Sequence, residues 1–88
     1  MGPERHDGAE YHVNYRAPNY MPDVWFLCGA FDNLAEARAF FSAKLADDAA
    51  GAPVPGSEWR LVCVRDGAVV EVVEHIRRGD PAGRALAS

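Results

Sequence analysis

The sequence lacks the features that mark export or membrane insertion. It has no run of the roughly 20 apolar residues that a membrane-spanning helix needs, and its first residues, MGPERHDG, lack the apolar segment of a signal peptide. Only two of its 88 residues are cysteines, so a disulfide framework is not indicated. These absences predict a reduced, cytoplasmic protein without a membrane partner.

Residues for metal binding and catalysis are also scarce. Cys28, Cys63, His12 and His75 form the only set of soft ligands in the predicted strands, and no two of them have the close spacing of a zinc site. The two thiols are predicted to be small buried apolar groups, and a disulfide between adjacent strands stays open. Glu74 precedes His75, but neighbouring strand residues point to opposite faces, so the two do not form a catalytic pair. We expect no enzyme activity, metal or cofactor.

An excess of basic charge is missing as well. Nine Lys and Arg residues stand against 13 Asp and Glu, which gives a formal net charge of −4 and a pI near 5.2. This balance argues against phosphate binding as the main purpose and favours a basic partner. Arg77, Arg78 and Arg84 make the C-terminal residues basic, but without the interleaved aromatic residues typical of a nucleic-acid site.

The composition that remains is that of one small globular domain. Apolar residues make up 49% and charged residues 25% of the chain. Residues 1–9 and 77–88 are polar or interrupted by glycine and proline, and they are predicted to be flexible tails. The sequence therefore predicts a single α+β domain at residues 10–76.

The segment from Val24 to Gly51 organises the domain, and its second part is predicted to be a helix. Asn33 and Glu36 have the N-x-x-E spacing of a capping box at the helix start. Gly51 is predicted to be the left-handed residue after the helix end, and Pro53 prevents a restart. The apolar side chains of one helix face are predicted to form the core: Leu34, Ala37, Phe40, Phe41 and Leu45.

Alternating or β-branched segments predict four strands around this helix. They cover residues 10–16, 24–31, 58–65 and 68–76. Asp66-Gly67 lies between the last two and predicts a hairpin with a type I′ turn. The order is strand, strand, helix, strand, strand, which predicts a four-stranded antiparallel sheet with one helix packed across one face.

The strand at 24–31 is apolar on both sides, and one helix covers only one face of a sheet. Regular alternation places Val24, Phe26, Cys28 and Ala30 on one side and Trp25, Leu27, Gly29 and Phe31 on the other. A loop, a terminus or another subunit must cover the second face. We predict a homodimer that buries sheet surface. The candidate interaction surface comprises Tyr20, Met21, Trp25, Leu27 and Arg60.

One fragment resembles a known family. Cys28-Gly29-Ala30-Phe31, followed by Asn33 and by Ala35, Ala37 and Ala39, is similar to a segment of SPOR domains, which bind the glycan strands of peptidoglycan. The family pattern continues to a second helix, where this chain has a hairpin. The leading hypothesis is a small non-enzymatic protein-interaction module of bacterial or phage type that acts through sheet surface and self-associates, with another protein as a further candidate partner. A SPOR-like glycan binder and a nucleic-acid-binding sheet are the alternatives.

Overall fold

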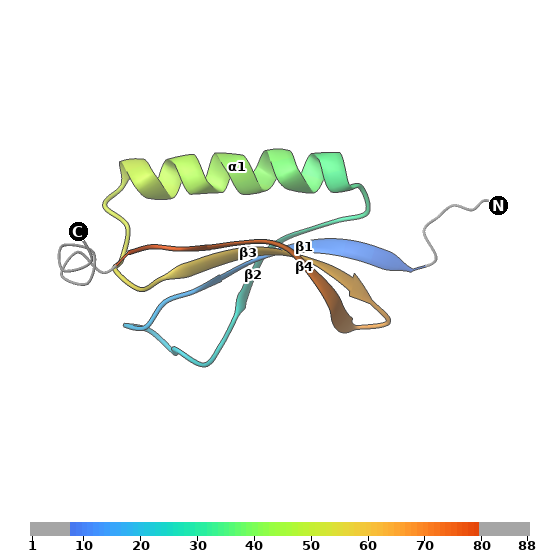
Figure 1. Cartoon of the computed structure of the whole chain (residues 1–88), viewed down its shortest axis with the longest axis horizontal. Helices are drawn as coiled ribbons and strands as arrows, with labels where there is room; N and C mark the ends of the chain where they lie inside the picture. Colours follow the sequence, from blue (N-terminus) through green and yellow to red (C-terminus); the bar gives the residue numbers. More distant parts are fainter. Residues whose placement is uncertain (1–7, 80–88) are drawn as a thin grey trace.

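The computed structural model describes residues 8–79 of the chain. Its elements follow one another as β1 (Ala9–Arg16), β2 (Phe26–Phe31), α1 (Leu34–Ala50), β3 (Glu58–Arg65) and β4 (Ala68–Arg77) (Figure 1). Every neighbouring pair of strands is antiparallel. The predicted α+β class and the ββαββ order are confirmed.

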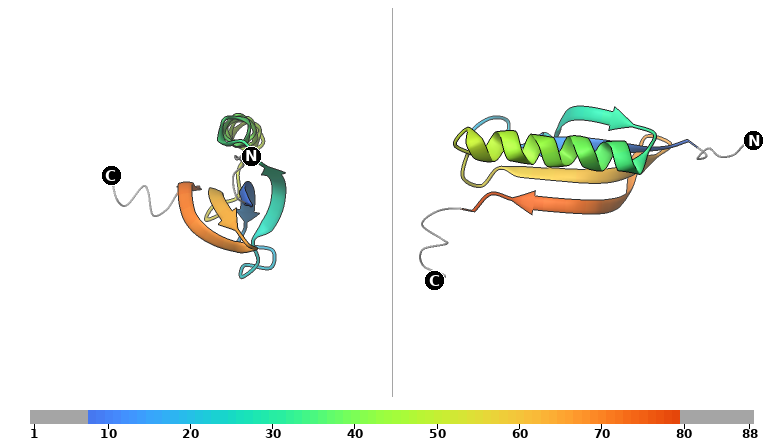
Figure 2. Two further views of the ribbon diagram at one scale, coloured as in Figure 1. Left: turned by 90° about the vertical axis from the view of Figure 1, so that its right-hand side faces the viewer. Right: turned by 90° about the horizontal axis from the view of Figure 1, so that it is seen from above.

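The four strands form one sheet in the order β2-β1-β3-β4, so β2 and β4 are its edges. The helix lies along one face over β1, β2 and β3, and no other element of residues 8–79 lies on the opposite side (Figure 2). We call these the covered face and the open face. The described chain begins and ends at opposite ends of the long axis (Figure 1).

The helix begins as predicted and ends differently. The Asn33 side chain accepts a hydrogen bond of 3.1 Å from the backbone N–H of Glu36, so Asn33 is the N-cap. The prediction that Gly51 is left-handed is wrong, since its φ is −103°. The Gly51 N–H still donates to the carbonyls of Asp47 and Asp48. The left-handed residue comes one position later, at Ala52, which has a φ of 65°.

The core lies between the helix and the covered face. Its buried members are Val13, Ala37, Phe41, Trp59 and Leu61. The other three residues predicted for the helix core face, Leu34, Phe40 and Leu45, are partly buried and pack against this cluster. The Phe41 side chain is 2% exposed, so the helix is held mainly by apolar burial.

The β3–β4 hairpin has the predicted turn and a longer second strand. Asp66 and Gly67 have φ values of 54° and 79°, as a type I′ turn requires. The ladder skips Val70 and Val73, which are therefore bulge residues of β4. The strand continues to Arg77, one residue beyond the predicted end.

The prediction of regular alternation over residues 24–31 is wrong. The strand starts at Phe26, and the ladder pairs Val13 with Gly29 but Asn14 with Leu27, so Cys28 is a bulge residue. The extra residue reverses the alternation. Phe26, Gly29 and Phe31 consequently share the covered face, whereas Leu27 and Ala30 share the open face.

The ordered chain reaches slightly beyond the predicted domain. Ala9 belongs to β1 and Arg77 to β4, so both lie in strands rather than in tails. The Arg78 guanidinium then donates to the Asp48 carboxylate at 2.8 Å and to the Leu45 carbonyl at 2.9 Å, which ties the end of β4 to the helix. The remaining tail predictions, for residues 1–7 and 80–88, lie outside the described residues.

Candidate interaction surface on the open face of the sheet

The open face has a polar end and an apolar end. The polar end, which we call the Trp25 cluster, comprises Arg16, Trp25, Glu58, Arg60 and His75. The apolar end, which we call the valine patch, comprises Val62, Val64, Val69 and Val72. Cross-strand pairing of Arg60 with His75, Val62 with Val72, and Val64 with Val69 places both groups on the same face.

Trp25 directly precedes β2, and its ring reaches across the neighbouring strands. The guanidinium carbon of Arg16 on β1 lies 4.4 Å from the ring centroid, and that of Arg60 on β3 lies 4.1 Å from it. The His75 ring on β4 meets the indole edge-on at 6.5 Å between centroids. The indole therefore covers the polar end of the open face, and its contacts with two arginines are cation–π interactions.

Glu58 links the two sides of the cluster. Its carboxylate accepts a hydrogen bond of 2.9 Å from Arg16 and one of 2.8 Å from His75. These hydrogen bonds, that from Arg16 first, lower the pKa of Glu58 from its ordinary value. Glu58 therefore stays ionised and compensates part of the cationic charge around Trp25.

Arg60 forms no salt bridge with the Glu58 carboxylate, which pairs with Arg16 and His75. Its Nε donates to the Asn14 side chain at 3.0 Å, and within residues 8–79 it makes no ion pair with a carboxylate. Burial and then the charge of Arg16 lower the pKa of Arg60. The cluster therefore holds more positive than negative charge, on a chain that is acidic as a whole.

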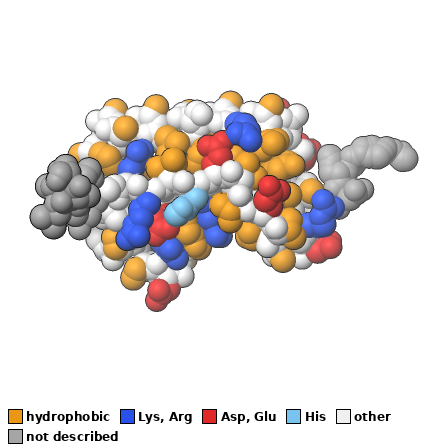
Figure 3. Space-filling view, viewed as in Figure 1, with side chains coloured by type: hydrophobic (Ala, Val, Ile, Leu, Met, Phe, Trp, Pro, Cys, Tyr) orange, Lys and Arg blue, Asp and Glu red, His pale blue; other side chains and the backbone are white. Residues whose placement is uncertain are grey.

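The valine patch changes from buried to exposed toward the sheet edge. Val62 is 0% exposed at the centre of the face, whereas Val69 and Val72 on the edge strand are 44% and 51% exposed. Figure 3 shows hydrophobic side chains reaching the surface among the charged groups of this side of the molecule. The loop of residues 17–25 and the β3–β4 hairpin both project on the open side (Figure 1). The valine patch is therefore an apolar surface that is buried at the sheet centre and exposed to solvent on the edge strand β4.

The residues predicted for interaction divide between two places. Trp25 and Arg60 meet in the cluster, and Leu27, which is 58% exposed, lies on the open face beside them. Tyr20 and Met21 are also exposed, at 63% and 49%, but the Tyr20 ring stacks on Phe26 instead.

Sequence reasoning missed Arg16 on β1 and His75 on β4 as members of this surface. Alternation places Arg16 and His75 on defined sides of their own strands, but it does not say which strands are neighbours. The pairing of β1 with both β2 and β3 is what brings Arg16, Glu58 and Trp25 together. The valines were predicted only as β-branched strand residues.

The cysteines do not form a site. Cys28 on β2 and Cys63 on β3 are free thiols, and β1 lies between their strands, so they do not oppose each other. Cys63 is buried as predicted, but the prediction of a buried thiol is wrong for Cys28, which is exposed. Burial raises the pKa of the Cys28 thiol, against the opposing charge of Lys44. In the described part of the chain, no three His, Cys, Asp or Glu residues gather to hold a metal ion. No helix within residues 8–79 has the length and apolarity to cross a membrane.

Comparisons with protein-family models, with curated proteins and with solved structures found no match to this chain. The similarity of the segment that starts at Cys28 to SPOR domains therefore stays a resemblance.

Proposed function

We propose that this protein is a non-enzymatic protein-interaction module that self-associates through the open face of its sheet. The valine patch carries the proposal. Val69 and Val72 keep about half of their surface in water beside the fully buried Val62. Burying the exposed half of one such side chain contributes roughly 1 kcal/mol, so a partner that covers the patch gains from every valine it contacts.

Size and shape fit a second copy of the chain as that partner. Four strands spaced about 4.8 Å apart, with a rise of about 3.3 Å per residue, present a face of roughly 500 Å². Two such faces would bury about 1,000 Å², the lower limit of a specific interface. Twisted sheets of the same hand pack face to face at about −30°, and a second copy has the same twist. The expected dimer is weak and depends on concentration.

Charge on the open face also permits self-association. The face holds cations, such as Arg16 and Arg60, together with the carboxylates of Glu10 and Glu58, so two copies need not repel each other. The mixed signs fit nucleic acid less well, because phosphate backbones select a surface of one sign. The indole of Trp25 is already in contact with two guanidinium groups rather than free to stack on a base.

Solution mass across a concentration series, by light scattering after gel filtration, tests the proposal. The chain mass is 9.6 kDa, and we expect the measured mass to approach twice this value as concentration rises. Val72→Glu should abolish the increase, since it places a charge in the patch. Ala43→Glu adds the same charge on the exposed outer face of the helix and should leave the increase unchanged. A monomer at every concentration, or equal loss in both variants, would contradict the proposal.

Two further points belong to the same proposal. The free thiols of Cys28 and Cys63 support a reducing, cytoplasmic location, and the small size suits an accessory protein of a bacterium or phage. Retention on peptidoglycan sacculi would instead support the SPOR-like alternative. Salt-sensitive retention on heparin or DNA would support the nucleic-acid alternative.

A further inference from the structure

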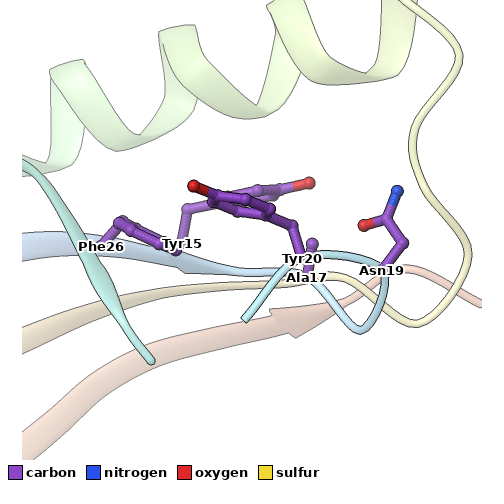
Figure 4. Close-up of a pocket in the computed structure, with 5 residues that line it drawn as sticks. All are labelled: Tyr15, Ala17, Asn19, Tyr20 and Phe26. Carbon is purple, nitrogen blue, oxygen red and sulfur yellow. The ribbon is translucent and has the colours of Figure 1, made fainter. Parts of the chain in front are cut away.

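A second recess lies on the covered side of the sheet, beside the start of the loop that follows β1. It has a volume of about 240 Å³ and is lined by Tyr15, Ala17, Asn19, Tyr20 and Phe26. Tyr15 and Phe26 are a cross-strand pair on the covered face. Figure 4 shows the aromatic side chains gathered below the helix, with Asn19 toward the loop. We call this recess the aromatic hollow.

The loop holds Tyr20 in place although its side chain is 63% exposed. The backbone of Tyr20 bridges to Ala17, with a hydrogen bond of 3.3 Å from the Tyr20 N–H to the Ala17 carbonyl. Pro18 fixes the backbone inside that turn. The ring then stacks on Phe26, with centroids 5.8 Å apart and planes 20° from parallel. An exposed aromatic ring is thus preorganised against a second ring.

Backbone strain accompanies this arrangement. Met21, directly after Tyr20, has a φ of 45°, a left-handed conformation that costs a residue with a side chain roughly 1–2 kcal/mol. Such strain persists where the surroundings over-determine it, and it gathers at binding sites. The Met21 carbonyl accepts a hydrogen bond of 3.0 Å from the Val24 N–H, which fixes the strained turn. The strained turn therefore belongs to a loop with a fixed conformation, which holds the Tyr20 ring in a defined position.

The polar groups of the residues that line the hollow are the hydroxyls of Tyr15 and Tyr20 and the side-chain amide of Asn19, and each of them can donate and accept a hydrogen bond. Within residues 8–79 the hydroxyl groups of Tyr15 and Tyr20 and the side-chain amide of Asn19 make no hydrogen bond to protein atoms. In Figure 4 the two hydroxyl groups point in opposite directions. No charged side chain lines the hollow. The lining therefore suits a ligand that is mainly apolar and uncharged, with polar groups at its rim that pair with these hydroxyls and this amide.

We propose that the aromatic hollow binds a proline-containing segment of a partner protein in the extended polyproline II conformation. A pyrrolidine ring is apolar and compact enough to pack against the exposed side of stacked aromatic rings. The neighbouring carbonyl groups of such a segment are free, because polyproline II has no internal hydrogen bonds, and they accept from tyrosine hydroxyls and amides. A glycan is disfavoured, because nearly all of the exposed lining is apolar and a sugar ring needs polar partners around its rim.

This inference goes beyond the proposed function and concerns a different surface. The hollow opens beside Tyr20 and Phe26, whereas the valine patch lies on the far side of the sheet, on β3 and β4. Dimer formation through the open face would leave the hollow free. Each proposal can therefore be tested, and contradicted, without the other.

Titration of the isotope-labelled protein with an uncharged, capped hexaproline peptide, followed by two-dimensional NMR, tests the site. Weak, saturable binding should shift the amide signals of Ala17, Asn19 and Tyr20, and should leave those of Val69 and Val72 unchanged. Tyr20→Ala should weaken the binding about tenfold, the effect of losing one stacked ring. Tyr20→Phe keeps the ring and should weaken it only about two- to threefold, through the lost hydroxyl.

Controls make each result decisive. A capped peptide of alternating glycine and serine, equal in length, should cause no shift, and Val69→Ala should bind hexaproline like the unmodified protein. Tyr20 is largely exposed, so Tyr20→Ala should keep the melting temperature and test binding alone. The proposal is overturned if hexaproline leaves the hollow signals unchanged, or if Tyr20→Ala binds it equally well. Shifts at the hollow with a chito-oligosaccharide but not with hexaproline would overturn it in favour of a glycan.

Discussion

The two faces of this sheet reach burial by different routes. On the covered face, the helix seals Val13 and Leu61, which are both 0% exposed. On the open face, Val62 is also 0% exposed, yet its cover is made of neighbouring side chains. At the polar end of that face, the Trp25 indole lies against the guanidinium groups of Arg16 and Arg60. The covered face thus resembles a packed core, and the open face a surface that another protein can cover.

The largest expected effect breaks the covered face. Phe41→Ala should lower the free energy of unfolding by about 3–5 kcal/mol, since it leaves a cavity where the helix meets the sheet. Val72→Ala, on the open face, should lower it by less than about 1 kcal/mol, because that side chain is half exposed. Urea denaturation of both variants gives the comparison. Equal losses would show that the two faces are packed alike.

A smaller effect is expected when the cover of the open face is removed. Trp25→Ala should cost roughly 1–2 kcal/mol, because two cation–π contacts, each worth about 0.5–1 kcal/mol, are lost. The melting temperature should fall, and self-association should weaken with it. Tyr20→Ala removes an aromatic residue outside the cluster and serves as the control. A loss as large as that of Phe41→Ala would make Trp25 part of the main core.

The smallest effect depends on pH. The pKa of Glu58 is lowered in the folded protein, so its contribution to stability is present above its ordinary pKa of 4.5 and is lost as the pH falls through the lower folded value. Glu58→Gln should therefore cost roughly 1 kcal/mol at pH 7, as partly exposed ion pairs do, and the difference from the unmodified protein should shrink below pH 4.5.

Glu71→Gln is the matched control for this titration. Glu71 is exposed on β4 and makes no ion pair within the described residues. Denaturant unfolding at several pH values measures both variants. A Glu58→Gln difference that stays constant from neutral to acid pH would contradict the assigned role of the carboxylate.

The parts of the fold that were predicted correctly are those that short sequence patterns determine. The residues of β1 alternate between polar and apolar, Asp66-Gly67 supports a type I′ turn, and Asn33 caps the helix. Each feature depends on residues within a few positions of one another, so sequence spacing is enough to reveal it.

The parts that were missed depend on distant residues. The bulge at Cys28 puts Gly29 under the helix, where an added Cβ would lie 2.9 Å from the Phe40 ring. A glycine inside a strand pattern is the one signal in this segment for a bulge or a close approach, but it does not reveal which distant residue comes near. The Trp25 cluster needs β1 between β2 and β3, an order that alternation along single strands does not determine. The sequence therefore predicted individual residues of the candidate site, but not which residues lie next to one another.

The position of the chain ends has a mechanical consequence. β1 and β4 run parallel to each other with β3 between them, and the described chain leaves them at opposite ends of the molecule (Figure 1). The hydrogen bonds of antiparallel ladders lie perpendicular to the strands. Tension between Gly8 and Gly79 would therefore shear whole ladders instead of opening them bond by bond. The load would pass in series through the β1–β3 and β3–β4 ladders, and because both are loaded in shear, the domain should resist stretching along its chain more strongly than its small size suggests.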